Sequence, residues 1–150
     1  MTDALHTACI QNEPLSLADT LAALQGGALS ATQLVEGCLA RIAARDGALH
    51  AFLHLDAEGA RGAVASPVAG PLSGIPWAIK DTFDAAGLPA TANSRFRAGR
   101  VATRDAALVQ ALRGTGAVLL GKLATWEYGT GTGAEYFDLP APPARNPWDT

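Results

Sequence analysis

The sequence predicts an α/β fold, in which helices precede a strand–helix–strand unit of a mostly parallel or mixed sheet. Residues 75–79 are short, apolar and rich in β-formers, which is typical of a strand entering a core. Residues 117–121 are apolar apart from one glycine, as in a parallel strand that is covered on both faces. Residues 104–113 lie between them with helical spacing. This order predicts a right-handed βαβ crossover.

Three helices and a short extended piece are expected before this unit. Residues 15–24 follow a helix pattern with Ser16 as the N-cap, and two glycines stop it. A second helix begins at Ser30 with a capping-box pattern and is expected to close at Gly47. Residues 52–55 read as extended, and residues 56–64 as a third helix. These elements indicate packing and carry no evident chemistry.

The helix expected at residues 104–113 is capped by Thr103 or Asp105 in this interpretation. Its spacing assigns four residues to the buried face: Ala107, Leu108, Ala111 and Leu112. The strand that follows leads to Lys122, which we expect to reach solvent. One further helical turn is expected at residues 125–128, and residues 129–150 read as glycine- and proline-rich loop.

Composition excludes several functional classes. Apolar residues make up 49% and charged residues 17% of 150 residues, which fits one folded domain. The formal net charge of −3 argues against a general nucleic-acid surface or a binder of anionic membranes. No apolar run is long enough to span a bilayer, and no secretory signal is evident. Cys9 and Cys38 lie far apart without a metal-binding pattern, so a cytoplasmic protein is expected.

Two glycine motifs resemble nucleotide-binding signatures but stand in the wrong context. Residues 116–122 match seven positions of a phosphate-binding loop, yet Leu123 occupies the place of the Ser or Thr that would hold Mg²⁺. Residues 129–134 fit a dinucleotide fingerprint, but the turn-prone residues after them do not open a helix. The three histidines lack metal-ligand spacing. We therefore expect no cofactor and no metal.

Lys80 is the candidate functional residue. It ends the strand of residues 75–79, on the face that carries Ala78, whereas alternation sends Asp81 to the opposite face. A strand-end lysine usually extends its amine to solvent. A buried amine instead loses its proton more easily and can act as a base or a nucleophile. Both interpretations remain open on this residue alone.

Several segments, taken together and in order, resemble the amidase signature family. The resemblance covers roughly residues 28–150. Residues 70–81, which include Lys80, resemble that family's segment around its catalytic lysine. The other matching segments are residues 86–92, the pattern from Asp105 to Lys122 with Glu127 after it, and residues 142–149.

The resemblance implies that amide bonds are hydrolysed or transferred by a lysine and two serines. One serine attacks the carbonyl, and the second, held by a cis peptide, relays its proton to a neutral lysine. This role implies a desolvated seat for Lys80. In the family, the loop at residues 126–133 lies near the substrate, so the resemblance implies Thr130 and Gly131 as substrate-binding residues.

The family's glycine- and serine-rich loop, which carries both serines, is not found in residues 1–150. We therefore expect the chain to be the incomplete N-terminal part of a single amidase domain. Residues 1–27 would form a leader and a short helix, and residues 28–150 the family-like region. The isolated chain is expected to be inactive.

Three functions remain open. The first is a free-standing amidase acting on a small-molecule amide, without direct nucleic-acid or membrane partners and able to form a homo-oligomer. Residues 126–133 differ from the run associated with the family's tRNA-dependent amidotransferase subunits, which favours this function. The second is the amidase-like subunit of a glutaminyl- or asparaginyl-tRNA amidotransferase. The third is a non-catalytic α/β interaction module. The amide substrate is not identified by the sequence.

Overall fold

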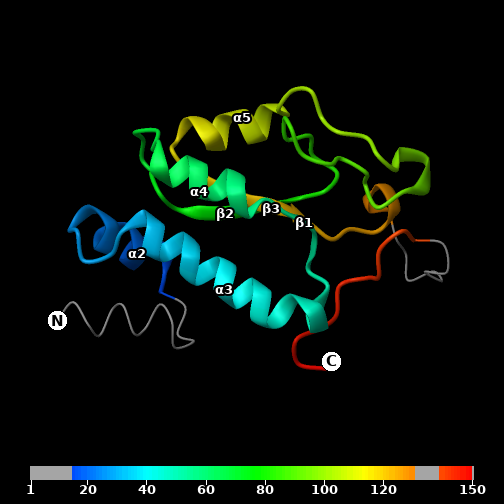
Figure 1. Ribbon diagram of the computed structural model, residues 1–150, viewed down its shortest axis with the longest axis horizontal. Helices are drawn as coiled ribbons and strands as arrows, with labels where there is room; N and C mark the ends of the chain where they lie inside the picture. The colour runs from blue at the N-terminus through cyan, green and yellow to red at the C-terminus, as the bar shows by residue number, and fades with distance from the viewer. Residues whose placement is uncertain (1–14, 131–138, 150) are drawn as a thin grey trace.

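The computed structural model describes residues 15–130 and 139–149. Its helices pack around a small β-sheet (Figure 1). The α-helices are α2 (Leu17–Gln25), α3 (Ala31–Leu49), α4 (Ala57–Ala65) and α5 (Ala107–Gly114). The strands are β1 (Phe52–Leu55), β2 (Pro76–Lys80) and β3 (Val118–Leu123), and the 3₁₀ turns are η1 (Arg95–Arg97) and η2 (Glu127–Gly129).

The three strands form a mixed sheet with the order β1-β3-β2. β2 pairs with β3 in parallel, with α5 between them in the chain, so the predicted βαβ unit is confirmed. β1 pairs with β3 in the antiparallel sense. β3 is the central strand, and five of its six residues are buried. The strand β3 is apolar for the reason that the sequence predicts, because a neighbouring strand covers each of its edges and packed side chains cover each of its faces.

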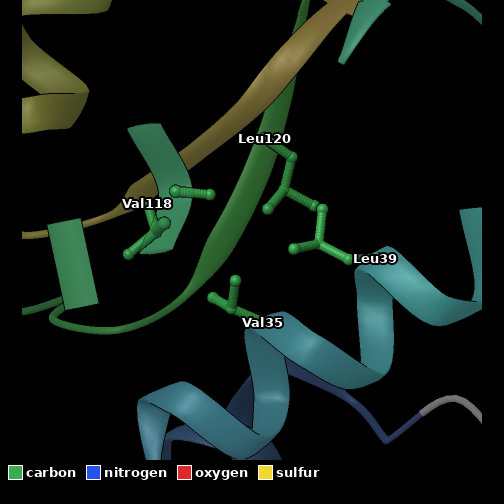
Figure 2. Packing of buried hydrophobic residues seen from close by; sticks show 5 residues of the cluster. Val35, Leu39, Val118 and Leu120 are labelled. Atoms are coloured by element: carbon green, nitrogen blue, oxygen red, sulfur yellow. The ribbon is translucent and has the colours of Figure 1, made fainter. Parts of the chain in front are cut away.

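Apolar layers cover the two faces of β3. Val118 and Leu120 pack on one face against Val35 and Leu39 of α3 and against α4, and Figure 2 shows these side chains facing one another. Leu119 points to the other face, into a cluster with Ile79 of β2 and Val109 of α5. Figure 1 shows α3 and α5 on opposite sides of the sheet. Alternation along one strand thus fills both layers.

The predicted N-caps of the first two helices are confirmed. Ser16 Oγ accepts from Asp19 N at 3.1 Å at the start of α2. Ser30 Oγ accepts from Gln33 N at 3.1 Å, and Gln33 Oε1 accepts from Ser30 N at 2.9 Å, which completes the capping box of α3. The predicted end at Gly47 is wrong, because α3 continues to Leu49. His50 ends it in the left-handed conformation, with φ of 52°.

The helix α5 differs from the prediction in its cap and its buried face. Ala106 is the N-cap, without a side-chain hydrogen bond. The Asp105 carboxylate instead accepts from Ala86 N at 2.7 Å, so it ties the helix start to the loop after β2. Val109 is fully buried, whereas Leu108 is 47% exposed. The helical spacing is confirmed, but the buried stripe lies on a different side of the helix from the one expected.

A β-bulge on the central strand changes the direction of its last side chains. Trp77 pairs with Leu119 and Ile79 pairs with Lys122, so two steps on β2 match three on β3. A Cβ atom at Gly121 would collide with the His54 carbonyl oxygen of β1. Glycine therefore permits the close approach of β1 at the bulge.

Among the helices that the structure describes, none has the length and apolar character required to span a bilayer.

Candidate active site

Lys80 is the last residue of β2, at the carboxyl end of the parallel pair. Its partner across the sheet is Leu123 of β3, and the next amide, Asp81 N, donates to Leu123 O at 3.1 Å. The Lys80 side chain is exposed, whereas the side chain of Asp81 is 1% exposed. The predicted separation of these two residues onto opposite faces is confirmed. The expected desolvated seat is wrong for this structure, because β2 is an edge strand and the Lys80 side chain is exposed.

The Lys80 amine lies beside the segment that follows β3. A Cβ atom at Gly129 would lie 3.2 Å from Lys80 Nζ and 3.4 Å from Thr82 Cγ2. Gly129 has φ of +77°, and Tyr128 before it also has a positive φ of 50°. Glycine therefore gives the lysine stem room at this point. A primary amine at the carboxyl edge of a sheet can exchange protons with a group placed over it.

The two predicted substrate-binding residues follow directly. Thr130 is exposed, and its hydroxyl donates to Glu127 O at 3.1 Å, across the turn η2. Thr130 follows Gly129, the residue whose Cβ position lies 3.2 Å from Lys80 Nζ. Gly131 lies outside the described residues.

Lys122 does not extend to solvent, and that prediction is wrong. Its side chain is 0% exposed, and its Nζ lies 2.6 Å from Asp81 Oδ1. The same amine donates to Pro89 O at 2.8 Å. The bulge at Gly121 places Lys122 opposite Ile79, on the buried face, instead of at the open end of the strand. Sequence reasoning missed this pair, although the glycine before Lys122 was a signal for a bulge.

The loop after β2 is held to this edge by further buried polar contacts. Thr91 donates its backbone N–H and its hydroxyl to Asp81 Oδ2, at 3.0 and 2.8 Å. The buried Asn93 side chain donates to Thr125 O at 3.0 Å and accepts from Ala141 N at 3.2 Å. Asn93 thus joins the segments after β2 and β3 to residue 141, which is far along the chain. A long loop fixed in this way can present groups with defined positions.

An ion pair on the outer side of the same loop is partly exposed. Arg100 donates to both oxygens of Asp84, at 2.6 and 2.5 Å. The hydrogen bond from Arg100 holds the pKa of the Asp84 carboxyl below its usual range, against the opposing effect of partial burial. The pKa of the Arg100 guanidinium is raised by the same contact. This pair links residue 84 to residue 100 and so closes the loop.

Two hollows lie at opposite ends of β3. A hollow of about 110 Å³ is lined by Ala124, Thr125, Trp126, Pro143 and Ala144, at the carboxyl end of the strand. The Thr125 hydroxyl is buried there and has no hydrogen-bond partner among the described residues. A larger hollow of about 200 Å³ lies at the amino end, beside Val118 and Arg113. The smaller one is the relevant candidate for a ligand, because it lies at the same edge as Lys80.

Within residues 15–130 and 139–149, no cluster of three or more His, Cys, Asp or Glu side chains is arranged to hold a metal ion.

Comparison with known proteins gives sequence and structural relatives. A glutamyl-tRNA(Gln) amidotransferase subunit from Salinispora arenicola is 40% identical over 144 residues, which cover 90% of this chain and 29% of the relative. The same protein from Anaeromyxobacter dehalogenans is 40% identical over 143 residues, with 90% and 29% covered. The chain thus spans less than a third of the length of these relatives.

The solved structures include hydrolases with other substrates. A 6-aminohexanoate cyclic dimer hydrolase superposes with a TM-score of 0.80 at 30% identity, covering 90% of this chain and 28% of that one. The peptide amidase of Stenotrophomonas maltophilia superposes with a TM-score of 0.73 at 34% identity, covering 79% of this chain and 26% of that one. Most of the fold of this chain is therefore shared with enzymes that differ in the substrate they are named for. The Amidase family model matches residues 33–150, and the chain belongs to this family.

Proposed function

We propose that this chain supplies Lys80 as the proton-accepting base of an amide C–N hydrolase that works by a Lys–Ser–Ser mechanism. The observation that carries the proposal is the position of Lys80, at the carboxyl end of β2 and beside Gly129, in a chain of the Amidase family. One serine hydroxyl would attack the carbonyl carbon, and the second serine would relay the attacking serine's proton to Lys80. Return of this proton to the amide nitrogen would let the C–N bond break and ammonia or an amine leave, and water would then hydrolyse the acyl-serine to the acid. The serines are not assigned to any residue of this chain.

The mechanism requires a neutral amine, and an exposed lysine is mostly protonated near neutral pH. Lys80 therefore needs cover from a segment that carries the serines, which would desolvate the amine as it completes the site. Gly129 already lies beside one side of the lysine amine. The proposed substrate is a small-molecule amide, whose acyl or amine group would reach the hollow beside Thr125.

The test uses the protein as its gene encodes it and measures ammonia release from small carboxamides. Lys80→Ala is expected to lower kcat/KM by about 10²- to 10⁴-fold, the usual contribution of a general base. Arg61→Ala, which changes a surface cation of α4, is the control and should leave turnover unchanged. Turnover of Lys80→Ala near the wild-type value would exclude the proposed role. A folded gene product with no hydrolysis of any amide would favour an interaction module.

A second function is favoured by the sequence relatives. Those cited above are subunits of glutamyl-tRNA(Gln) amidotransferases and are 40% identical. In this alternative, the same lysine would serve glutamine hydrolysis within a complex. Co-purification with the other components of such a complex, and ammonia release that depends on charged tRNA, would support the amidotransferase. Turnover of free carboxamides by the purified protein alone would support the free-standing amidase.

A further inference from the structure

The buried pair of Asp81 and Lys122 is set by the register of the sheet. Without the bulge, regular alternation from Leu119 would place Lys122 on the face of Leu120, toward α3. The extra residue on β3 moves Lys122 opposite Ile79. Lys122 therefore points to the face of the sheet on which the side chains of Ile79 and Asp81 lie. A glycine at position 121, against the backbone of β1, makes this local change sterically possible. The lysine is thus directed inward by the backbone.

Each of the two charges is hydrogen-bonded to the other and to the loop. Lys122 Nζ donates to Asp81 Oδ1 at 2.6 Å and to Pro89 O at 2.8 Å. The other carboxylate oxygen, Asp81 Oδ2, accepts two hydrogen bonds from Thr91. A buried ion pair is a poor means of gaining stability, since apolar residues of the same size often perform as well. Its presence next to Lys80 therefore needs another explanation.

That explanation lies in the neighbouring residue. Asp81 follows Lys80 directly, and its backbone N–H is hydrogen-bonded to the end of β3. With its carboxylate held by Lys122 and Thr91, Asp81 fixes the peptide that carries the Lys80 side chain. The same contacts hold the Asp81 carboxylate on the buried face, away from the exposed Lys80 amine. The exposed lysine is thereby left available for another partner.

We propose that Asp81 and Lys122 are positioning residues for Lys80, and that their buried ion pair fixes the end of β2 so that the Lys80 amine faces the segment at Gly129. This inference rests on the proposed function of Lys80. It predicts that the pair acts on the rate of the chemical step, because a misplaced base costs turnover, whereas substrate binding is left largely intact.

The experiment compares three variants in the protein as its gene encodes it. Asp81→Asn and Lys122→Met each break the pair, and the double variant Asp81→Asn/Lys122→Met removes both charges. For each we measure kcat and KM for a small carboxamide, together with the midpoint of urea unfolding. Asp84→Asn is the matched control, since it breaks a different ion pair of the same loop. Lys80→Ala, measured in parallel, tests the proposed function itself.

The proposal predicts a separation of stability from turnover. Each single variant should lose at least about tenfold in kcat with KM within about threefold of the wild type. The double variant should regain most of the unfolding midpoint, because no lone charge stays buried, but its kcat should stay low. Asp84→Asn should keep its kcat. The single variants need not fold well for this test, because the double variant decides it.

Two results would overturn the proposal. If kcat of the double variant recovers together with its unfolding midpoint, the pair is merely structural. If KM rises while kcat is unchanged, the pair acts on substrate binding. Failure of the proposed function is distinguished from both, because in that case Lys80→Ala itself would retain full turnover.

Discussion

Lys122 Nζ lies 2.6 Å from Asp81 Oδ1, and both side chains are withdrawn from solvent. The pair joins the residue after β2 to the central strand, and a second hydrogen bond from Lys122 joins it to the carbonyl of Pro89 in the loop. Since each charge is compensated by the other, removal of one leaves an ion in a site that water does not reach. The pair therefore makes the packing of this edge depend on two particular residues.

Asp81→Asn is expected to destabilise the chain by roughly 3 kcal/mol, because Lys122 would keep a buried charge without its counter-ion. The double variant Asp81→Asn/Lys122→Met should recover most of that free energy of unfolding, because Met replaces the lysine stem without a charge. Urea denaturation followed by circular dichroism provides the measurement. Equal destabilisation in the single and double variants would show that the ion pair is not what the structure depends on.

The order of helices and strands could be predicted from the sequence, because the patterns that indicate each element lie within that element. Ser16 and Ser30 have side chains that bond to their own helix starts, and the apolar run of β3 reports burial on both faces. The partner of Lys122 could not be found in this way. Asp81 is 41 residues distant in sequence, and the two meet only because of a change in register at Gly121.

Gly121→Ala tests that change in register. The added methyl group would collide with the backbone of His54, and backbone has no alternative rotamer by which to move away. We expect β1 to separate from β3 at this point, with a loss of at least about 2 kcal/mol, the range seen for overpacked sites. The measurement is the free energy of unfolding together with amide exchange along β1.

Gly62→Ala is the matched control for this substitution. Gly62 lies within α4, and a Cβ atom there meets nothing within 4 Å. Alanine should stabilise the helix by about 0.5–1 kcal/mol, since glycine is the poorer helix former. If both alanine variants were equally stable, the close approach at Gly121 would carry no energetic consequence.

The pair of Asp84 and Arg100 predicts a dependence of stability on pH. Its hydrogen bonds lower the pKa of Asp84 in the folded chain, so the folded state binds the proton less tightly than the unfolded state. The resulting stabilisation is present above the unfolded pKa of about 3.9 and is lost as the pH falls through the lower, folded pKa. Because Asp84 and Arg100 are 31% and 37% exposed, solvent screening limits the contribution to at most about 1 kcal/mol.

Unfolding curves of the wild type and of Asp84→Asn, recorded between pH 6 and about pH 2.5, isolate this contribution from that of the other carboxyl groups. The difference in free energy should be largest at pH 6 and should diminish in acid. A difference that stays constant across this range would mean that the loss comes from packing and not from the titration of Asp84.

The sequence could not settle the environment of Lys80 or the buried face of α5. Alternation places the Lys80 side chain on a face, but whether that face is covered depends on segments outside β2. In the same way, helical spacing defines a stripe on α5 without saying which neighbour meets it, and Val109 rather than Leu108 is the buried residue. Both errors concern packing between distant parts of the chain.

The two lysines of the chain should differ strongly in their reactivity toward an acylating reagent. Lys80 is exposed, whereas the amine of Lys122 is buried and hydrogen-bonded, so the reagent can reach Lys122 only when this edge opens. Brief treatment with an acetyl succinimidyl ester, followed by mass spectrometry of peptides cut at arginine, should give at least about tenfold faster modification of Lys80. In denaturing urea the two rates should become similar, which controls for intrinsic reactivity. Equal rates in the folded chain would contradict the burial of Lys122, and with it the positioning role that we assign to its pair with Asp81.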